Sequence, residues 1–364
     1  MTKKVFGKSA LNIFRILSLF AIILLVIPGC KKDDDSDDDL TGNWMSKADF
    51  EGVTRSEAVA FTIGDKAYVG TGYDGTDRLK DFWEYDPVAN DWTRKADFPG
   101  IARSGAVGFG TDSKGYIGTG YDEDGNKLKD FWEYDPSSDT WTQIADFGGS
   151  ARYGAVAFTI NNKGYVGTGY DDNCLKDFWC YDPSLKTWTE VRSLTGGKRR
   201  DAVAFVINGI AYVCTGINNG SYLSDFYAYD PTTDAWTAKS AIINQSDDSF
   251  DDEYSGIDGI NKVAFAVGGK GYVVSGGKST TGTDTWEYDP TADLWTRKTY
   301  LEASARMEAV GFAIGSLGYV ATGRSSSYYF DDVWAFNPGQ EQIDNDKIMI
   351  VSLNDFAKKV NSRL

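Results

Sequence analysis

Residues 80–87 read KDFWEYDP, and the same eight letters return at residues 129–136 and, with one change, as KDFWCYDP at residues 176–183. A charged, aromatic peptide that recurs three times is either a binding site made in several copies or a structural unit laid down repeatedly. The residues around each copy distinguish these possibilities, because a structural unit brings its neighbours with it.

The recurring peptide belongs to a longer repeat that tryptophan marks. Trp-Thr stands at Trp92, Trp141, Trp188, Trp236 and Trp295, and Trp44 opens an earlier copy, with spacings of 48, 49, 47, 48 and 59 residues. Between tryptophans the order is nearly constant: Arg-x-x-Ala-Val, a strand ending in Gly-Thr-Gly, and Asp-x-Trp-x-Tyr-Asp-Pro. Four short strands at this period are typical of a β-propeller blade.

The second copy illustrates the expected strands, which lie at residues 106–109, 115–119, 131–134 and 141–144. Asp135 and Pro136 end the third strand, since proline donates no ladder hydrogen bond and both residues favour turns. One such sheet cannot bury both of its faces alone, so the copies must stack around a ring. The sequence therefore predicts an all-β fold with one blade per copy.

Over residues 44–338 the chain resembles kelch-repeat proteins. The resemblance rests on the arginine before the first strand, the glycines that close the second, Tyr-Asp-Pro after the third and the tryptophan that opens the fourth. It implies a six-bladed kelch β-propeller. One element differs, because Gly-Thr-Gly at Gly70, Gly118 and Gly167 replaces the usual Gly-Gly, which only Gly276-Gly277 keeps.

The two ends of the repeat complete each other. The last copy ends in Phe336-Asn337-Pro338, and no tryptophan follows it. We therefore expect residues 44–49 to supply the missing outer strand, so that the N-terminal strand pairs with the last blade and closes the ring. Residues 339–364 are expected to form a C-terminal tail with a strand or a short helix.

The N-terminal segment has the features of an export signal. Four basic residues precede an apolar run at residues 16–27. This run is shorter than the ~20 residues of a spanning helix, so residues 1–29 are predicted to be a signal peptide. The following Ile-Pro-Gly-Cys resembles a bacterial lipobox, which implies lipidation of Cys30; a plain signal peptide is the alternative.

Residues 30–43 are predicted to be a lipidated, acidic and disordered tether. Six aspartates fall between positions 33 and 39, and like charges at this density repel one another. The order of lysine and then acidic residues after Cys30 resembles the sorting signal of surface lipoproteins. The expected location is the bacterial outer membrane, with the propeller facing outward.

Charge and composition exclude several classes of function. The formal net charge is −16, which argues against nucleic acid and against membrane contact other than through the lipid. The chain contains no histidine. The copper site of galactose oxidase, which shares the kelch architecture, therefore has no counterpart, and Ser-His-Asp and Cys-His catalytic groups are excluded. We expect no cofactor and assign no catalytic residue.

Two further sites remain open from the sequence. Cys174, Cys180 and Cys214 are left if Cys30 carries lipid, and a disulfide between Cys174 and Cys180 is one possibility. Asp122, Asp124 and Asn126, with Glu133 eleven residues after Asp122, imitate a calcium-binding loop, although Lys127 stands at the sixth place, where such a loop has glycine.

Arginine offers the first candidate ligand site. Arg55, Arg103, Arg152, Arg199 and Arg306 all stand three residues before Ala-Val. In a propeller this position faces the mouth of the central channel, where guanidinium groups bind carboxylate or sulfate. The alternative, which we favour because ion-pair networks are common in protein scaffolds, is that these arginines pair with the aspartates before the third strands. These are Asp81, Asp130, Asp177, Asp225, Asp284 and Asp332.

Departures from the repeat offer the second candidate. Tyr73, Tyr121 and Tyr170 follow the second-strand glycines in only three copies, in loops that share the mouth. The fifth copy lacks the arginine and carries an acidic insertion, INQSDDSFDDEYSGIDG. Tyrosines around an arginine-lined cavity suit an anionic sugar or a peptide.

We therefore predict a surface-exposed lipoprotein that binds a glycan, preferably anionic, or a protein partner at the propeller mouth. The alternatives are a sugar mutarotase or epimerase resembling the kelch proteins that act on sialic acid, and a structural scaffold in a surface complex that uses the insertion. A monomer or one part of such a complex is expected, and an enzyme is the less favoured reading.

Overall fold

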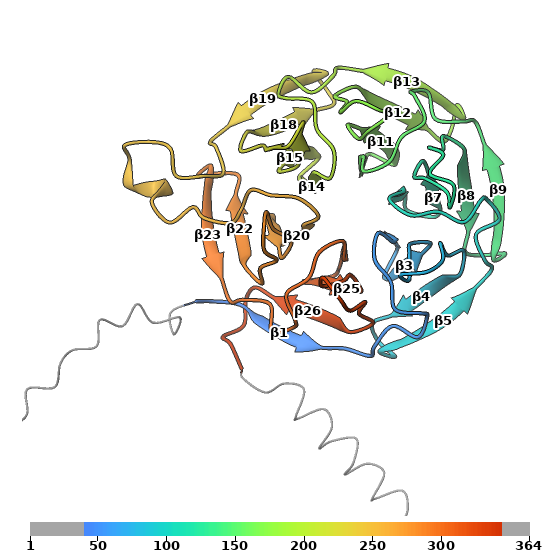
Figure 1. Ribbon diagram of the computed structural model, residues 1–364, viewed down its shortest axis with the longest axis horizontal. Helices are drawn as coiled ribbons and strands as arrows, with labels where there is room; N and C mark the ends of the chain where they lie inside the picture. The colour runs from blue at the N-terminus through green and yellow to red at the C-terminus, as the bar shows by residue number, and fades with distance from the viewer. Residues whose placement is uncertain (1–39, 344–364) are drawn as a thin grey trace, which may run out of the picture. The chain divides into compact units, whose positions relative to one another are not determined.

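The computed structural model of the protein describes residues 40–343. Six four-stranded antiparallel sheets surround a central axis as the blades of a propeller (Figure 1). In this part of the chain no helix is long and apolar enough to cross a membrane. The predicted signal peptide at 1–29, Cys30 with most of the predicted tether, and the predicted tail beyond Ile343 lie outside the described residues.

The first three blades follow one another along the chain, each built from its innermost strand outward. Blade 1 contains β2 (Val59–Ile63), β3 (Lys66–Gly70), β4 (Phe82–Asp86) and β5 (Asp91–Lys95). Blade 2 contains β6 (Val107–Gly110), β7 (Gly115–Gly118), β8 (Phe131–Asp135) and β9 (Thr140–Ile144). Blade 3 contains β10 (Val156–Ile160), β11 (Lys163–Gly167), β12 (Phe178–Asp182) and β13 (Thr187–Val191).

Of the other three blades, blade 5 keeps this order, blade 4 adds a two-stranded ribbon and blade 6 takes its outermost strand from the N-terminal end. Blade 4 contains β14 (Val203–Ile207), β15 (Ile210–Cys214), β18 (Phe226–Asp230) and β19 (Ala235–Lys239), with a ribbon of β16 (Ile217–Asn218) and β17 (Ser221–Tyr222). Blade 5 contains β20 (Val263–Val267), β21 (Lys270–Val274), β22 (Thr285–Asp289) and β23 (Leu294–Lys298). Blade 6 contains β24 (Val310–Ile314), β25 (Leu317–Ala321), β26 (Val333–Asn337) and β1 (Asn43–Ser46).

Blade 6 is completed from both ends of the repeat, as predicted. β1 pairs with β26 in antiparallel register, with Asn43 opposite Asn337 and Ser46 opposite Trp334. Trp44 is fully buried, and its indole Nε1 donates to the carbonyl of Thr299 at 3.1 Å. Pairing the first strand with the last joins the two ends and closes the ring.

The recurring octapeptide is a packing unit. In β4, Phe82 and Tyr85 are fully buried, and the Phe82 ring lies 4.8 Å from Tyr134 and 4.9 Å from Trp141 of the next blade. Burying one such side chain contributes about 1.5–3 kcal/mol. Asp86 accepts backbone hydrogen bonds from Val88 and Ala89, which turns the chain toward the next strand. The repetition of KDFWEYDP is therefore structural.

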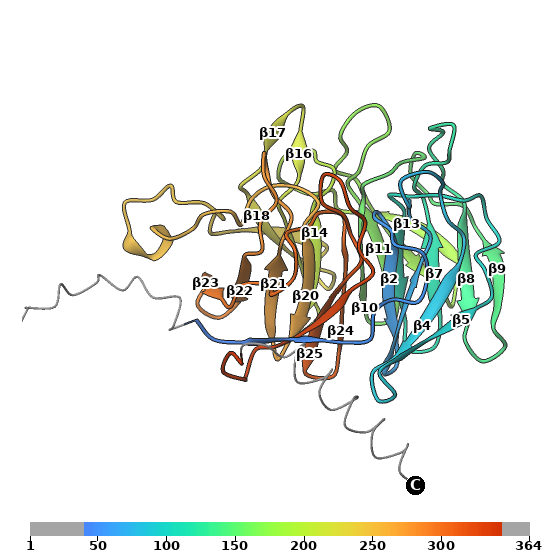
Figure 2. The same ribbon diagram turned by 60° about the horizontal axis from the view of Figure 1, so that its bottom comes forward.

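The innermost strands have one face in the blade interface and one toward the axis. In β2, Val59, Phe61 and Ile63 are buried, whereas Ala60 lines the channel. Alanine and glycine occupy most of the channel positions, leaving a cavity of about 210 Å³. The loops that follow the second strands, including β16–β17, project from the end where the innermost strands begin (Figure 2), which we call the mouth.

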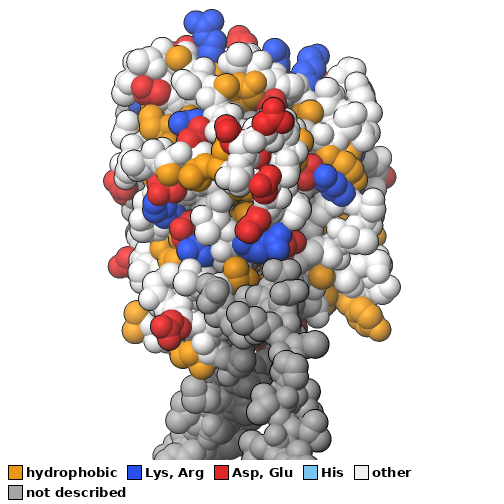
Figure 3. Space-filling model, turned by 90° about the vertical axis from the view of Figure 1, so that its left-hand side faces the viewer, with side chains coloured by type: hydrophobic (Ala, Val, Ile, Leu, Met, Phe, Trp, Pro, Cys, Tyr) orange, Lys and Arg blue, Asp and Glu red, His pale blue; other side chains and the backbone are white. Residues whose placement is uncertain are grey.

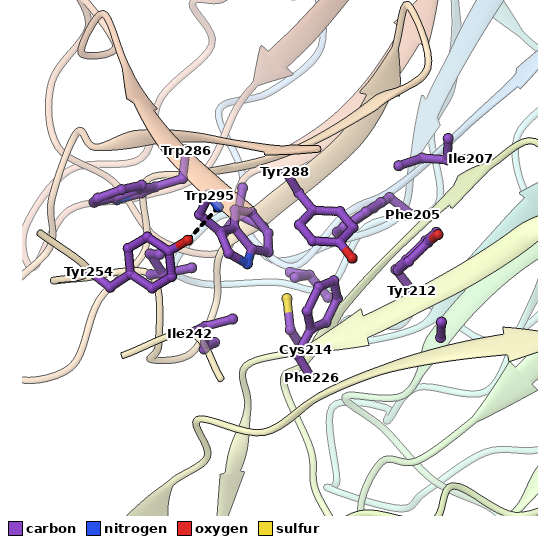
Figure 4. Packing of buried hydrophobic residues seen from close by; sticks show 14 residues of the cluster. Phe205, Ile207, Tyr212, Cys214, Phe226, Ile242, Tyr254, Trp286, Tyr288 and Trp295 are labelled. Atoms are coloured by element: carbon purple, nitrogen blue, oxygen red, sulfur yellow. Dashed lines mark hydrogen bonds between the residues drawn. The ribbon is translucent and has the colours of Figure 1, made fainter. Parts of the chain in front are cut away.

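The insertion of blade 5 lies on the outer circumference, beside β23 (Figure 1). Ile242, Tyr254 and Ile257 anchor it in the core between blades 4 and 5, and Tyr254 Oη accepts the backbone N–H of Trp295 at 2.6 Å (Figure 4). The side of the molecule that carries this insertion has acidic and basic side chains interspersed with small apolar spots (Figure 3). The insertion is thus remote from the channel.

Candidate functional site

The repeated arginines lie inside the blades. Arg55 is fully buried, and its Nη1 and Nη2 donate to the two carboxylate oxygens of Asp81 at 2.8 and 2.6 Å. Its Nε donates to the carbonyl of Val53, and Nη1 donates also to that of Thr71. Burial alone would raise the pKa of Asp81, but the hydrogen bonds and charge of Arg55 hold it below its usual value.

The same arrangement recurs in four other blades. The pairs are Arg103–Asp130, Arg152–Asp177, Arg199–Asp225 and Arg306–Asp332, with shortest distances of 2.7, 2.8, 2.6 and 2.7 Å. All five arginines are at most 1 % exposed. We call these five ion pairs the clamps. The prediction that the clamp arginines bind a ligand is therefore corrected: their side chains face away from solvent and are held by aspartate and backbone carbonyls.

Blade 5 replaces its clamp by another route. Gly259 stands in the arginine position, and Lys262 stands three residues later, where the other blades have alanine. Its Nζ donates at 2.7 Å to the carbonyl of Ser275, the counterpart of Thr71. Burial lowers the pKa of Lys262 to about 8, against the opposing charges of Asp284 and Asp258. In blade 5 the amino group of Lys262 thus donates to the backbone carbonyl that an arginine binds in the other blades.

Two residues after each clamp position, the chain forms a ring around the channel. This mouth ring consists of Glu57, Gly105, Gly154, Asp201, Asn261 and Glu308, all with φ between 52° and 61°. Backbone hydrogen bonds of 2.9–3.1 Å link five of the six neighbouring pairs from blade to blade, for example from the N–H of Asp201 to the carbonyl of Gly154. The left-handed backbone and these bonds place the side chains at the axis.

Three carboxylates therefore share a cavity of about 160 Å³ with Tyr153 and Asn261. Burial raises the pKa of Asp201 to about 6; Arg200, its ion-pair partner, opposes this shift, and the charges of Glu57 and Glu308 add to it. Asp201 Oδ1 lies over Gly154, where an added Cβ would approach it to 2.4 Å. Among the described residues this atom accepts no hydrogen bond, so it remains available to a ligand.

The other two carboxylates are bound by side chains of the loops around the mouth, Tyr121 and Arg324. We call these loop side chains, with Arg78 and Arg200, the rim. Glu57 Oε2 accepts the hydroxyl of Tyr121 at 2.7 Å, and its Oε1 has no partner among the described residues. Glu308 is bound by Arg324 through Nε and Nη2 at 2.6 and 2.9 Å. The floor of the mouth thus offers hydrogen-bond acceptors at Glu57 and Asp201, while Glu308 is saturated.

The three predicted tyrosines lie at this mouth. Bridges pair Ser56 with Tyr73, Ser104 with Tyr121 and Tyr153 with Tyr170, which aligns them beside the ring. The ring centroids of Tyr121 and Tyr153 are 4.9 Å apart, and those of Tyr153 and Tyr170 are 5.5 Å apart. They form one aromatic wall over blades 2 and 3. Tyr73 stands apart from it, against Tyr329 of blade 6.

Guanidinium groups stand above the carboxylates. Arg78 lies over the rings of Tyr121 and Tyr73, at 4.4 and 5.4 Å from their centroids. The side chains of Arg200 and Arg324 are 33 % and 31 % exposed. Nε and Nη2 of Arg200 and Nη1 of Arg324 have no hydrogen-bond partner among the described residues. The rim therefore offers donors where the floor offers acceptors.

Comparison with known proteins agrees with this architecture. A family model described as the KLHDC2/KLHL20/DRC7 Kelch-repeats domain matches residues 101–249, and the Kelch motif matches residues 54–99. The chain is a kelch-repeat protein. A solved structure titled "Structure of YjhT" superimposes on this kelch propeller with a TM-score of 0.67 and 16% identity, over 79% of this chain and 95% of that one. No curated protein matches the sequence.

Neither the calcium-like loop nor the disulfide left open from the sequence is formed among the described residues. Asp122 Oδ1 accepts the N–H groups of Asp124 and Asn126 at 3.1 and 2.8 Å, so the loop is closed by its own backbone. Within residues 40–343 no three acidic, cysteine or histidine side chains are grouped to hold a metal. Cys174, Cys180 and Cys214 are free thiols, so a Cys174–Cys180 disulfide is not formed.

Sequence reasoning missed the mouth ring, Tyr153 and the rim arginines Arg78, Arg200 and Arg324. A signal for part of this set was present. The two residues between each clamp position and Ala-Val differ from copy to copy, as Ser-Glu, Ser-Gly, Tyr-Gly, Arg-Asp and Met-Glu. The prediction chose the constant arginine, which is structural, and did not consider the variable pair of residues that follows it.

Proposed function

We propose that this kelch propeller is a binding module for an anionic glycan, recognised at the mouth. The observation that carries the proposal is a cavity lined by acceptor oxygens of Asp201 and Glu57, beside which Arg200 and Arg324 are held by ion pairs to the lining residues Asp201 and Glu308. Both arginines keep further guanidinium donors without a partner among the described residues. A sugar acid matches this pattern, because its carboxylate binds guanidinium in a bidentate manner and its hydroxyls donate to carboxylates.

The size of the mouth cavity, which Tyr153 lines, and the tyrosine wall that continues from Tyr153 support the same ligand. Sites that bury a drug-sized molecule have about 300–1,000 Å³. The mouth cavity of about 160 Å³ suits a single terminal sugar unit. The wall of Tyr121, Tyr153 and Tyr170 provides apolar ring faces with hydroxyl groups at their edges, which is suited to a sugar ring.

A calorimetric titration with acidic and neutral monosaccharides tests the proposal. N-acetylneuraminic, glucuronic and galacturonic acids are compared with glucose and galactose. We expect binding of at least one acid, weakened about tenfold or more by Arg200→Ala, as for a lost charged hydrogen bond. Arg192→Ala removes an exposed arginine away from the mouth and controls for charge. Failure of every acid to bind, with one protein captured in pulldowns, would replace the glycan by a protein partner.

One observation favours a second candidate, a mutarotase or epimerase for such a sugar. A carboxyl group with a pKa near the working pH is suited to general acid–base catalysis, and the pKa of Asp201 is raised to about 6 beside Glu57. In that reaction Asp201 would exchange a proton with the anomeric hydroxyl or the ring oxygen. NMR exchange between anomers of N-acetylneuraminic acid should be accelerated by the wild type and not by Asp201→Asn. An equal rate without protein excludes this activity.

The proposed location is the outer face of a bacterial outer membrane, through lipid on Cys30. The lipobox-like sequence before Cys30 and the acidic segment after it support this proposal. Cys30→Ser should move the protein from the membrane fraction to the soluble fraction, and protease added to intact cells should digest the anchored wild type. Retention of Cys30→Ser in the membrane would contradict lipid anchoring.

A further inference from the structure

The end of the channel opposite the mouth carries a larger hollow. A cavity of about 530 Å³ is lined by the turns that join the first two strands of blades 1, 2 and 3. We call it the far-end cavity; its polar lining consists of Thr62, Thr111, Asp112, Thr159, Asn161 and Asn162. Its volume falls within the ~300–1,000 Å³ of ordinary small-molecule sites.

The cavity exists because three adjacent blades depart from the repeat. Thr62 and Thr159 occupy a position that holds Val206, Ala266 and Ala313 in blades 4 to 6. In blade 2, Thr111 is half-buried and stands where the other blades bury isoleucine or valine, for example Ile160, which is 3 % exposed. At these strand positions the far end is therefore polar in blades 1 to 3 and apolar in blades 4 to 6.

The walls of the far-end cavity are preformed. Asn162 and Asp112 exchange hydrogen bonds between blades 3 and 2, with the N–H of Asp112 donating to Asn162 Oδ1 at 2.9 Å. The hydroxyl of Thr159 donates to the carbonyl of Gly110 at 2.7 Å. A Cβ on Gly110 would lie 1.9 Å from the carbonyl of Thr62, so blades 1 and 2 are in close contact there. A rigid site loses little entropy on binding.

Each of the three blades contributes to the far-end cavity one polar group that has no hydrogen-bond partner among the described residues. Among the described residues, the Thr62 hydroxyl, Asp112 Oδ1 and the Asn161 amide have no hydrogen-bond partner. Together they provide a hydroxyl, a carboxylate oxygen and an amide, which both donate and accept. The lining has no cationic side chain, so it differs from the mouth in the charge that it favours.

We infer that the far-end cavity is a second ligand site, for a neutral molecule rich in hydroxyl groups. Such a ligand donates to Asp112 Oδ1 and exchanges hydrogen bonds with Thr62 and Asn161. A free polyol and the end of a neutral glycan have this chemistry in common. The site is independent of the mouth, since it uses other residues at the other end of the channel.

Saturation-transfer NMR and calorimetry on the full chain test the inference, with sorbitol as the free polyol and maltotriose as the neutral glycan. We expect at least one of them to bind. Asn161→Gly removes the amide but keeps a residue that tolerates the φ of 52° at this position. Thr62→Val introduces the residue that blade 4 has in this place. Each change should weaken binding about tenfold, as for one lost hydrogen bond within a site.

Asn208→Gly is the matched control, because Asn208 occupies the same turn position in blade 4 with a φ of 51° and lies outside the cavity lining. It should bind like the wild type, as should the mouth variant Arg200→Ala. Binding of neither probe, or wild-type affinity of both Asn161→Gly and Thr62→Val, overturns the inference. Loss of neutral-ligand binding in Arg200→Ala alone also overturns it and assigns that ligand to the mouth.

Discussion

The clamp arginines and the mouth ring lie two residues apart in sequence but have opposite properties. Arg103 is fully buried and shares a bidentate ion pair with Asp130, whereas Glu57 and Asp201 keep carboxylate oxygens without partners beside a cavity. The clamp recurs almost unchanged in five blades, whereas the mouth ring holds four residue types, with Glu, Gly, Gly, Asp, Asn and Glu in blades 1 to 6. Repetition within this chain therefore marks the frame, and variation inside the repeat marks the place where a ligand is recognised.

The largest difference between the two regions should be in stability. Removal of one partner from a buried ion pair destabilises a protein by about 3–5 kcal/mol. Arg103→Ala removes the guanidinium donors to Asp130 and to the carbonyls of Ile101 and Thr119, and leaves Asp130 with the indole of Trp132 but without a cation. A loss of this size is therefore expected in urea unfolding. Glu57→Gln in the mouth ring should change stability by less than about 1 kcal/mol. Equal losses in the two variants would remove the distinction between frame and site.

Blade 5 sharpens the comparison, because Lys262 replaces an arginine that cannot lose its proton. The ordinary pKa of this lysine is 10.5, and in the folded chain it is about 8. Between these values the unfolded chain binds more protons, so this group adds stability as pH rises from 8 to 10.5. The depression corresponds to about 3 kcal/mol.

Urea unfolding at several pH values tests this expectation. Relative to Lys262→Met, the wild type should gain about 3 kcal/mol between pH 7.5 and 10.5. Tyrosine ionisation affects both proteins alike and cancels in the difference. Lys198→Met, which removes an exposed lysine, is the control. A constant difference between wild type and Lys262→Met across this range would show that Lys262 is as solvated in the folded chain as in the unfolded one.

Most of the fold was predictable because each copy of the sequence repeat contains the same buried aromatic residues and the same turn residues. The strands expected at 131–134 and 141–144 agree with β8 and β9 to within one residue, and the missing strand after Pro338 correctly indicated closure by Trp44. Buried aromatics and Asp-Pro turns act locally, so each copy carries the information for its own blade.

The site was harder to predict, because the direction of a side chain depends on partners distant in sequence. Arg55 turns into the blade to meet Asp81 and the carbonyl of Thr71, and the sequence alone left this pairing and ligand binding as alternatives. The tyrosines were placed at the mouth, but Tyr153 was overlooked since it follows a clamp arginine in a position that holds serine in blades 1 and 2. The mouth ring follows from left-handed backbone at six positions, of which only Gly105 and Gly154 are glycine.

A change in the mouth ring should act on stability in the opposite direction to a change in the clamp. The ordinary pKa of Asp201 is 3.8, and in the folded chain it is about 6. The folded chain binds more protons between these values, so this group lowers stability as the pH rises from 3.8 to 6, and the full loss is present above pH 6. Asp201→Asn should therefore stabilise the protein at pH 7 by about 1–3 kcal/mol. This range allows for the loss of the partly exposed ion pair with Arg200, which offsets part of the gain.

This gain should shrink as the pH falls from 6 to 4, which thermal or urea unfolding of both proteins will show. Asp247→Asn in the exposed insertion controls for the change in net charge. A variant that is less stable than the wild type at pH 7 would mean that the contact with Arg200 outweighs burial, and Asp201 would then belong with the clamps.

The smallest expected effect is the coupling between carboxylates within the mouth. The charge of Glu57 contributes to the raised pKa of Asp201, so Glu57→Gln should lower that pKa by less than about one unit while the amide oxygen still accepts from Tyr121. Carbon-detected NMR titration of the aspartate carboxyl groups measures it. Glu123→Gln, whose carboxylate is 61 % exposed and pairs with Arg78, is the control and should leave Asp201 unchanged. An unchanged pKa of Asp201 in Glu57→Gln would mean that water screens the two carboxylates from each other. The mouth would then be an open, solvated surface and would not act as one recognition site.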